Sequence, residues 1–259
     1  MDDLESVIRS HHVAPGTVAI MWLEQSHFVL KTPWGLLVHV DPFLSRTVAP
    51  EKHIRARPLI DPDRTPADFV FLTHDHRDHT DPDTLVPMAR VSPVCRFIGP
   101  PESCGRMLSL GIDPTRIVEV VEGATVRLNG FSATAVYAQN TSEHDETTHL
   151  GFVFDFEGVR VYHAGDTRKN PDGYASRLDA VRGLAPDVLI VPINEGYNNP
   201  GPAGAARLAA IVEPRIVIPC HYDCFHQNTI DPAAFLRALP PDRRESVRTM
   251  EHGVFFTPA

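Results

Sequence analysis

The chain has 259 residues, 42% hydrophobic and 22% charged, with a formal net charge of −9. This composition is typical of a globular protein with a substantial core, and the negative charge argues against general nucleic-acid binding, which depends on clustered lysine and arginine. The start of the chain lacks the apolar region of a signal peptide, and no apolar stretch is long enough to span a bilayer. We therefore expect a single cytoplasmic domain over residues 1–259, with no nucleic-acid or membrane partner.

The first half of the chain predicts strands followed by two short helices. Residues 18–43 read as strands around a tight turn at residues 33–35, and residues 67–73 as a short buried strand. A short helix is expected within residues 82–93 and a strand over 95–100. Residues 101–111 begin with proline and end with glycine, as a short helix does.

The second half predicts two hairpins and a strand–helix–strand unit. Residues 124–138 alternate around an Asn-Gly turn, and residues 149–166 repeat the pattern around Glu-Gly. Residues 186–193 and 214–221 are strand-like and flank a helical stretch at 204–212, an order that favours parallel pairing. The predicted fold is of the α+β class, a sandwich of two mixed β-sheets with helices outside.

The stretch "FLTHDHRDHTD" at residues 71–81 contains His74-x-His76-x-Asp78-His79 directly after a predicted strand. Three other predicted strands also end in side chains that can bind metals, namely Asp41, Asp166 and His221. Active sites of layered proteins gather where loops from several strand ends meet. These residues therefore predict one metal site, and the alternative is a polar surface loop.

Imidazole and carboxylate ligands suit Zn, Mn or Fe as divalent ions. His74 and His76 can hold one ion, Asp78, His79 and His221 a second, and Asp166 can bridge the two. Two such ions can share a hydroxide and polarise the bond that it attacks. No G-x-S-x-G motif offers a serine nucleophile.

The four cysteines, Cys95, Cys104, Cys220 and Cys224, are expected to be free thiols. A zinc-finger interpretation of "CHYDC" at residues 220–224 lacks a second cysteine pair at matching spacing.

The His-rich motif, "GDT" at residues 165–167 and His221 resemble the metallo-β-lactamase superfamily. That resemblance implies an αββα sandwich with a dinuclear site and the ligand assignment given above. The segments "DPFLS" (41–45), "YHAGDT" (162–167) and "IPCHYDCF" (218–225) resemble, more narrowly, its L-ascorbate-6-phosphate lactonase-like branch. The resemblance implies a further histidine on the first metal.

The chain departs from that branch at two places. Where the further histidine is expected, the chain has Gln139 and Asn140, so His144, His149 or neither completes the first metal site. His149 is preferred because it begins a predicted strand. The segment 193–206 is short and has no basic residue before its end, which weakens the transfer of a sugar-phosphate lactone as substrate.

The candidate catalytic residues are Asp78, Asp166 and Tyr222, whose hydroxyl could bind an oxyanion or simply pack in the core. Arg77, Arg168 and Lys169 are candidates for binding an anionic substrate. Two other polar residues are expected to have supporting roles: His163 as a packed, hydrogen-bonded histidine, and Asp41 in a turn or beside a ligand.

The predicted function is a metal-dependent hydrolase that uses a metal-bound hydroxide to cleave an ester-type bond, preferably a lactone, in a small molecule, for which an anionic group is one option. A homo-oligomer is compatible with the sequence. The alternatives are hydrolysis of a small phosphodiester, a non-catalytic binding module of the same fold, and a redox di-iron centre, which usually accompanies a flavin domain.

Overall fold

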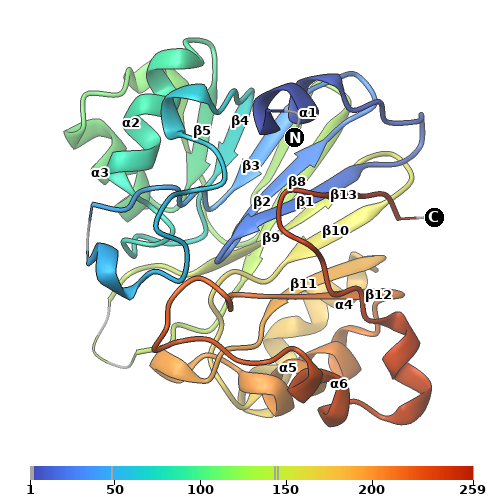
Figure 1. The fold of residues 1–259 in the computed structure, drawn as a ribbon. Coiled ribbons are helices and arrows are strands. Elements are labelled where there is room, and N and C mark those ends of the chain that lie inside the picture. Colours follow the sequence, from blue (N-terminus) through green and yellow to red (C-terminus); the bar gives the residue numbers. More distant parts are fainter. Residues whose placement is uncertain (1–2, 48, 143, 145, 259) are drawn as a thin grey trace.

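Two mixed β-sheets pack face to face in the computed structural model, and helices cover their outer sides (Figure 1). The structure describes residues 3–47, 49–142, 144 and 146–258. This arrangement confirms the predicted α+β class and the αββα order of layers. Within the described residues, no helix combines the length and apolarity needed to cross a membrane.

The first sheet has seven strands in the order β13-β1-β2-β3-β4-β5-β6. Neighbours from β13 to β3 are antiparallel, and those from β3 to β6 are parallel. The strands are β1 (Ala19–Glu24), β2 (His27–Lys31), β3 (Leu37–Val40), β4 (Phe69–Phe71), β5 (Arg96–Gly99), β6 (Ile117–Glu119) and β13 (Phe255–Phe256).

The second sheet has six strands in the order β12-β11-β10-β9-β8-β7. Its first two pairs are parallel and the rest antiparallel, so both predicted hairpins and the predicted parallel pair are confirmed. The strands are β7 (Thr125–Leu128), β8 (Phe131–Tyr137), β9 (Leu150–Asp155), β10 (Arg160–His163), β11 (Val188–Pro192) and β12 (Ile216–Cys220).

Helices α1, α2 and α3 lie outside the first sheet, and α4, α5 and α6 outside the second (Figure 1). Their bounds are α1 (Leu4–Ser10), α2 (Pro82–Val91), α3 (Pro101–Ser109), α4 (Asp179–Gly183), α5 (Gly201–Val212) and α6 (Ala233–Ala238). Short 3₁₀ segments are η1 (Pro50–Lys52), η2 (Pro62–Arg64), η3 (Pro114–Arg116), η4 (Pro171–Leu178), η5 (Gly196–Asn198) and η6 (Pro241–Ser246).

Strand β1 shows how the layers are held together. Ile20 and Trp22 belong to the large core between the sheets, whereas Met21 and Leu23 join a smaller core beneath α1. Because side chains alternate between the two faces of a strand, this wholly apolar run can serve two cores at once. The strand ends at the turn around Gln25, which reaches the site described below.

The structure adds detail to the predicted elements. Residues 18–43 contain three strands, because a second turn follows β1 at Gln25, whose φ is 53°. Helix α5 begins at Gly201, three residues before the predicted stretch. Helices α1, α4 and α6 were not predicted, since each is only five to seven residues long.

Candidate metal centre

Four side chains that follow strands meet at one edge of the sandwich. Asp41 follows β3 and His74 lies shortly after β4 in the first sheet, while Asp166 follows β10 and His221 directly follows β12 in the second. All four are at least nine-tenths buried. Parallel strands end at the same edge of a sheet, which is why residues so distant in sequence come together.

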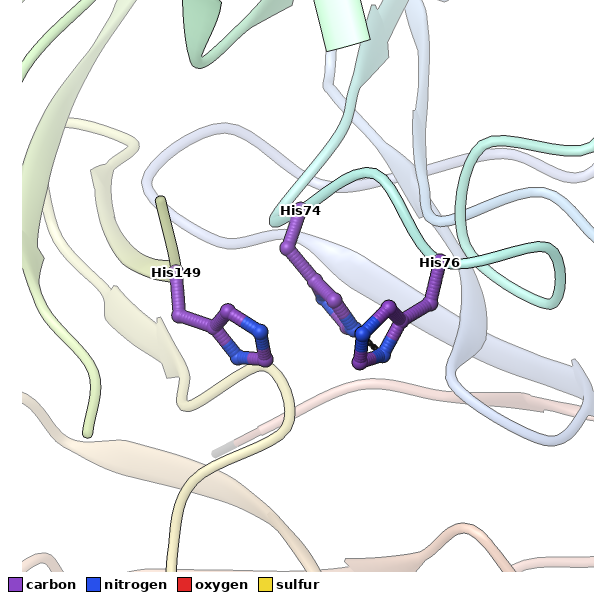
Figure 2. A group of neighbouring side chains, drawn as sticks. All are labelled: His74, His76 and His149. Carbon is purple, nitrogen blue, oxygen red and sulfur yellow. Dashed lines mark hydrogen bonds between the residues drawn. The ribbon is translucent and has the colours of Figure 1, made fainter. Parts of the chain in front are cut away.

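His74, His76 and His149 form one group (Figure 2). Their ligand nitrogens all lie within 4.8 Å of one another, and the His74 and His149 rings stack with centroids 4.0 Å apart. His149 therefore lies close enough to His74 and His76 to share one metal ion with them. His144 is exposed and outside this group.

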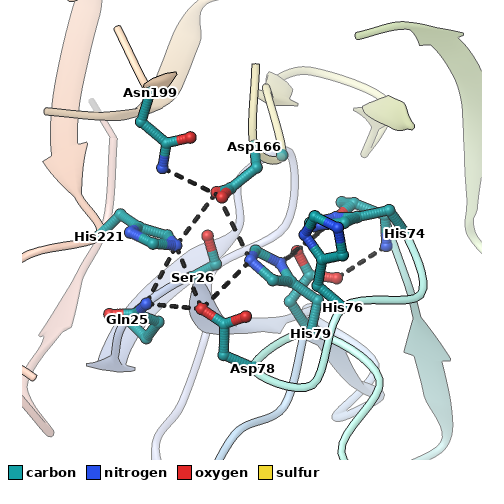
Figure 3. A network of polar contacts seen from close by, with 12 residues as sticks. Gln25, Ser26, His74, His76, Asp78, His79, Asp166, Asn199 and His221 are labelled. Carbon is teal, nitrogen blue, oxygen red and sulfur yellow. Dashed lines mark hydrogen bonds and ion pairs between the residues drawn. The ribbon is translucent and has the colours of Figure 1, made fainter. Parts of the chain in front are cut away.

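A second group contains Asp78, His79 and His221, and a third joins His74 and His79 to Asp166 (Figure 3). The Oδ1 atom of Asp166 lies 3.5 Å from His79 Nε2 and 3.1 Å from His221 Nε2. The Oδ2 atom of Asp78 lies 3.7 and 3.5 Å from the same two nitrogens. The three groups are thus contiguous, with His79 shared by two of them.

Hydrogen bonds fix which ring nitrogen of each histidine faces the centre. The Asp41 carboxylate can only accept, so it receives the Thr73 hydroxyl at 2.7 Å and His79 Nδ1 at 2.8 Å. The Thr73 oxygen is then left to accept from His74 Nδ1 at 3.0 Å. His149 Nδ1 donates to the backbone carbonyl of Asp166 at 3.1 Å. Each of these rings turns Nε2 toward the other ligands, as a metal-binding imidazole does.

The negative charge of the carboxylates in the site favours a bound cation. Burial raises the pKa of the Asp166 and Asp78 carboxyls, but the neighbouring His221 and His79 outweigh it and hold both values well below the ordinary range. Burial lowers the pKa of His79, yet Asp166, Asp78 and Asp41 outweigh that effect and raise it well above its ordinary value. Three carboxylates around one imidazole, two of them buried, are therefore stabilised by positive charge, which a divalent ion can supply in place of a proton.

Unsatisfied atoms test whether these residues fit a metal. Among the described residues, His79 Nε2 and Asp166 Oδ1 are buried without a hydrogen-bond partner. A buried polar atom without a partner is costly, and native proteins rarely keep one without a reason. Both atoms are ligand types for Zn, Mn or Fe and face each other, so the residues fit divalent metal ions.

Two residues not predicted from the sequence complete the network. Gln25 Nε2 donates to Asp78 Oδ2 at 2.7 Å and lies 3.1 Å from His221 Nε2, and Asn199 Nδ2 donates to Asp166 Oδ2 at 3.0 Å (Figure 3). Both orient a carboxylate of the site. Neither residue belongs to a motif: Gln25 lies in the turn after β1, and Asn199 directly follows η5.

Gly165 allows the segment before Asp166 to lie against its neighbours. Its φ is +60°, and a Cβ atom there would be 2.7 Å from the carbonyl oxygen of Leu150 and 3.0 Å from Thr73 Cβ. Only glycine tolerates that conformation and that close an approach. The "GDT" segment thereby brings Asp166 next to the histidines that follow β4.

A cavity of about 350 Å³ opens over the ligands and is lined by Asp78, Asp166 and His221 among others. Of the three basic residues predicted to bind substrate, Arg77 lines this cavity. Arg168 and Lys169 are not among its lining residues, and their role in substrate binding stays a prediction.

Tyr222 does not lie where a catalytic role would require. It is buried against Trp22, with ring centroids 4.7 Å apart, and lines a different hollow near His252. Consecutive side chains leave the backbone in different directions, so His221 faces the ligands and Tyr222 faces the core. This packing supports the alternative of a core tyrosine. His163 is also packed, as predicted, with Nε2 3.1 Å from the Ser26 carbonyl oxygen.

Several known proteins are similar to this chain. Residues 19–221 match the family described as "Beta-lactamase superfamily domain". A UPF0173 metal-dependent hydrolase of Methanosarcina mazei is 31% identical over 228 residues, which cover 85% of this chain and 90% of that protein. The solved structure of Igni18, a metallo hydrolase from Ignicoccus hospitalis, has a TM-score of 0.72 at 24% identity and covers 94% of this chain and 99% of its own. An isothiocyanate hydrolase from Delia radicum gut bacteria has a TM-score of 0.70 at 18% identity, covering 93% of this chain and 98% of its own.

Proposed function

Because the chain belongs to the beta-lactamase superfamily and to its UPF0173 metal-dependent hydrolases, we propose that this hydrolase holds two divalent ions and cleaves an ester-type bond in a small molecule. A lactone is the favoured substrate. The similar structures support the fold alone and host different reactions, so the bond that is cleaved has to be argued from the site.

The contiguous ligand groups carry the proposal. His74, His76 and His149 offer three nitrogens to one ion, while Asp78, His79 and His221 offer three atoms to another, with Asp166 beside both. Structural zinc sites are usually closed by four ligands, often cysteines. Groups of three ligands that border an open cavity instead leave positions for water and substrate.

Two bound divalent ions would supply an ionised water near neutral pH and would polarise the oxygen of the bond under attack. The residues of the chain hold the reactants in place. Asp41 and Thr73 orient the histidines, while Asn199 and Gln25 orient the two carboxylates. No serine or cysteine lines the cavity within the described part of the chain, which favours attack by water over a covalent intermediate.

The cavity limits the size of the substrate. A volume of about 350 Å³ suits a small molecule and not a polymer. The preference for a lactone rests on the segments that resemble the lactonase-like branch, and a small phosphodiester is the alternative that the same ligands would also serve.

The proposal is tested with protein reloaded with zinc or manganese. Hydrolysis of δ-valerolactone, 4-nitrophenyl acetate and bis(4-nitrophenyl) phosphate is compared before and after chelation, and bound metal is measured by mass spectrometry. We expect about two ions per chain, lactone or ester hydrolysis that is lost on chelation, and loss of both activity and metal in His79→Ala. His12→Ala, which removes an exposed imidazole outside the ligand groups, serves as the control.

Hydrolysis of the phosphodiester alone would replace the ester proposal with the alternative. Lactone hydrolysis that survives both chelation and His79→Ala would refute the proposed site.

A further inference from the structure

We infer that Lys52 binds an anionic group of the substrate, and that the substrate combines this group with an apolar body. The inference rests on the proposed function, because it places that substrate in the cavity over the ligands. Lys52 was not singled out in the sequence, since it lies in the loop between β3 and β4 and belongs to no motif.

The walls of the cavity are largely apolar. Phe43, Ala49, Tyr197 and Phe225 line it together with the ligands. The rings of Phe43 and Phe225 lie 5.9 Å apart between centroids, and the Tyr197 side chain is 75% exposed at the surface. An aromatic wall of this kind gains stability by covering an apolar part of a ligand.

Two cationic side chains, Arg77 and Lys52, line the same cavity, and only one of them is paired with carboxylates. Arg77 pairs with Asp81 at 3.2 Å and with Asp83 at 2.5 Å. Lys52 has no acidic partner within 4.0 Å among the described residues. The charge of Arg77 is therefore already balanced, whereas that of Lys52 is available to a bound anion.

The backbone around Lys52 is held against the segment that follows His221. The Lys52 carbonyl accepts from His226 N at 2.9 Å, and Ile54 N donates to the Cys224 carbonyl at 2.8 Å. The His53 ring packs against Phe225 in a tilted arrangement, with ring centroids 4.6 Å apart. These contacts fix the start of the lysine side chain at the cavity, so a charged ligand does not have to order the loop itself.

The metal ligands offer the alternative location for the anion. Asp78 and Asp166 also line the cavity, and divalent ions bound by them would also attract a carboxylate. An anion held at the ions would be insensitive to the charge at position 52, whereas an anion held by Lys52 would depend on it. Substitution at Lys52 therefore separates the two arrangements.

The test measures binding of two matched probes to the metal-loaded protein by calorimetry: 4-phenylbutyrate, which is anionic, and 4-phenylbutan-1-ol, which is neutral. We expect Lys52→Met to weaken binding of the carboxylate about three- to tenfold, the range of a partly exposed ion pair, and to leave the alcohol unchanged. Lys52→Arg should retain most of the affinity. Arg90→Met, which removes an exposed charge outside the cavity, should change neither probe.

Equal binding of the carboxylate by the wild type and Lys52→Met would overturn the inference, as would a loss of affinity for both probes. The measurement needs no turnover, so it is separable from the proposed reaction. Charge-dependent binding without any ester or lactone hydrolysis would contradict the reaction only. If the protein hydrolyses the ester or lactone, but the wild type and Lys52→Met bind the carboxylate equally well, only the role of Lys52 would be contradicted.

Discussion

Replacement of Asp41 by asparagine tests whether hydrogen bonding sets the metal-binding form of His79. Asp41 is fully buried and accepts three hydrogen bonds, two from Thr73 and one from His79 Nδ1 at 2.8 Å. Asparagine has a single acceptor oxygen. If that oxygen keeps the bond from Thr73 N, the new amide NH₂ faces His79 Nδ1. The ring hydrogen must then move to Nε2, the atom that faces Asp166.

We expect Asp41→Asn to lower affinity for a divalent ion about 10- to 100-fold, or about 1.4–2.7 kcal/mol. The measurement is a zinc titration in competition with a chromophoric chelator, with circular dichroism to confirm folding. Asp63→Asn, which makes the same change at an exposed site, is the control and should bind zinc as the wild type does. A folded Asp41→Asn protein with unchanged zinc affinity would refute the tautomer argument.

Three further predictions concern stability. Gly165→Ala should lower the free energy of unfolding by about 2 kcal/mol or more in urea titrations, because a side chain there adopts a positive φ and overlaps a backbone carbonyl; an unchanged midpoint would contradict the close approach. Glu24→Ala should cost about 3 kcal/mol by thermal unfolding, since it leaves the nearly buried Arg46 without its carboxylate; a loss near zero would show that water already screens the pair. Burial lowers the pKa of His39 from 6.5 to about 4 and that of its hydrogen-bonded neighbour His27 well below 6.5. The unfolded chain then takes up protons that the folded chain does not, so stability should fall as the pH drops below 6.5, by about 2 kcal/mol from His39 alone at pH 5. A variant with leucine at both positions should lose less unfolding free energy than the wild type as the pH falls from 6.5 to 5. An equal pH dependence in the two proteins would refute the assignment to His27 and His39.

Much of the fold could be predicted because its signals are local. The hairpins around Asn-Gly and Glu-Gly depend on turn residues within the hairpin itself, and the strand–helix–strand unit depends on apolar periodicity. The meeting of His74, Asp166 and His221 also followed from local information, since each comes at or shortly after the end of a predicted strand.

The remaining parts of the site depend on tertiary structure. Gln25 reaches Asp78 only because a turn with φ of 53° follows β1, and no motif marks that turn. Lys52 lines the cavity because its loop pairs with residues far along the chain. The direction of the Tyr222 side chain could not be predicted, because adjacency to His221 in the sequence does not determine which way a side chain points.

The ligand groups are spread unequally along the chain, and this bears on biosynthesis. The group of His74, His76 and His149 is complete once the first 149 residues have been made, but the group of Asp78 and His79 also needs His221. A ribosome adds those 72 further residues in roughly 4–15 s at ordinary elongation rates. During that interval the nascent chain contains the group of His74, His76 and His149 but lacks His221. The order of the ligands along the chain therefore sets the order in which the two groups can form.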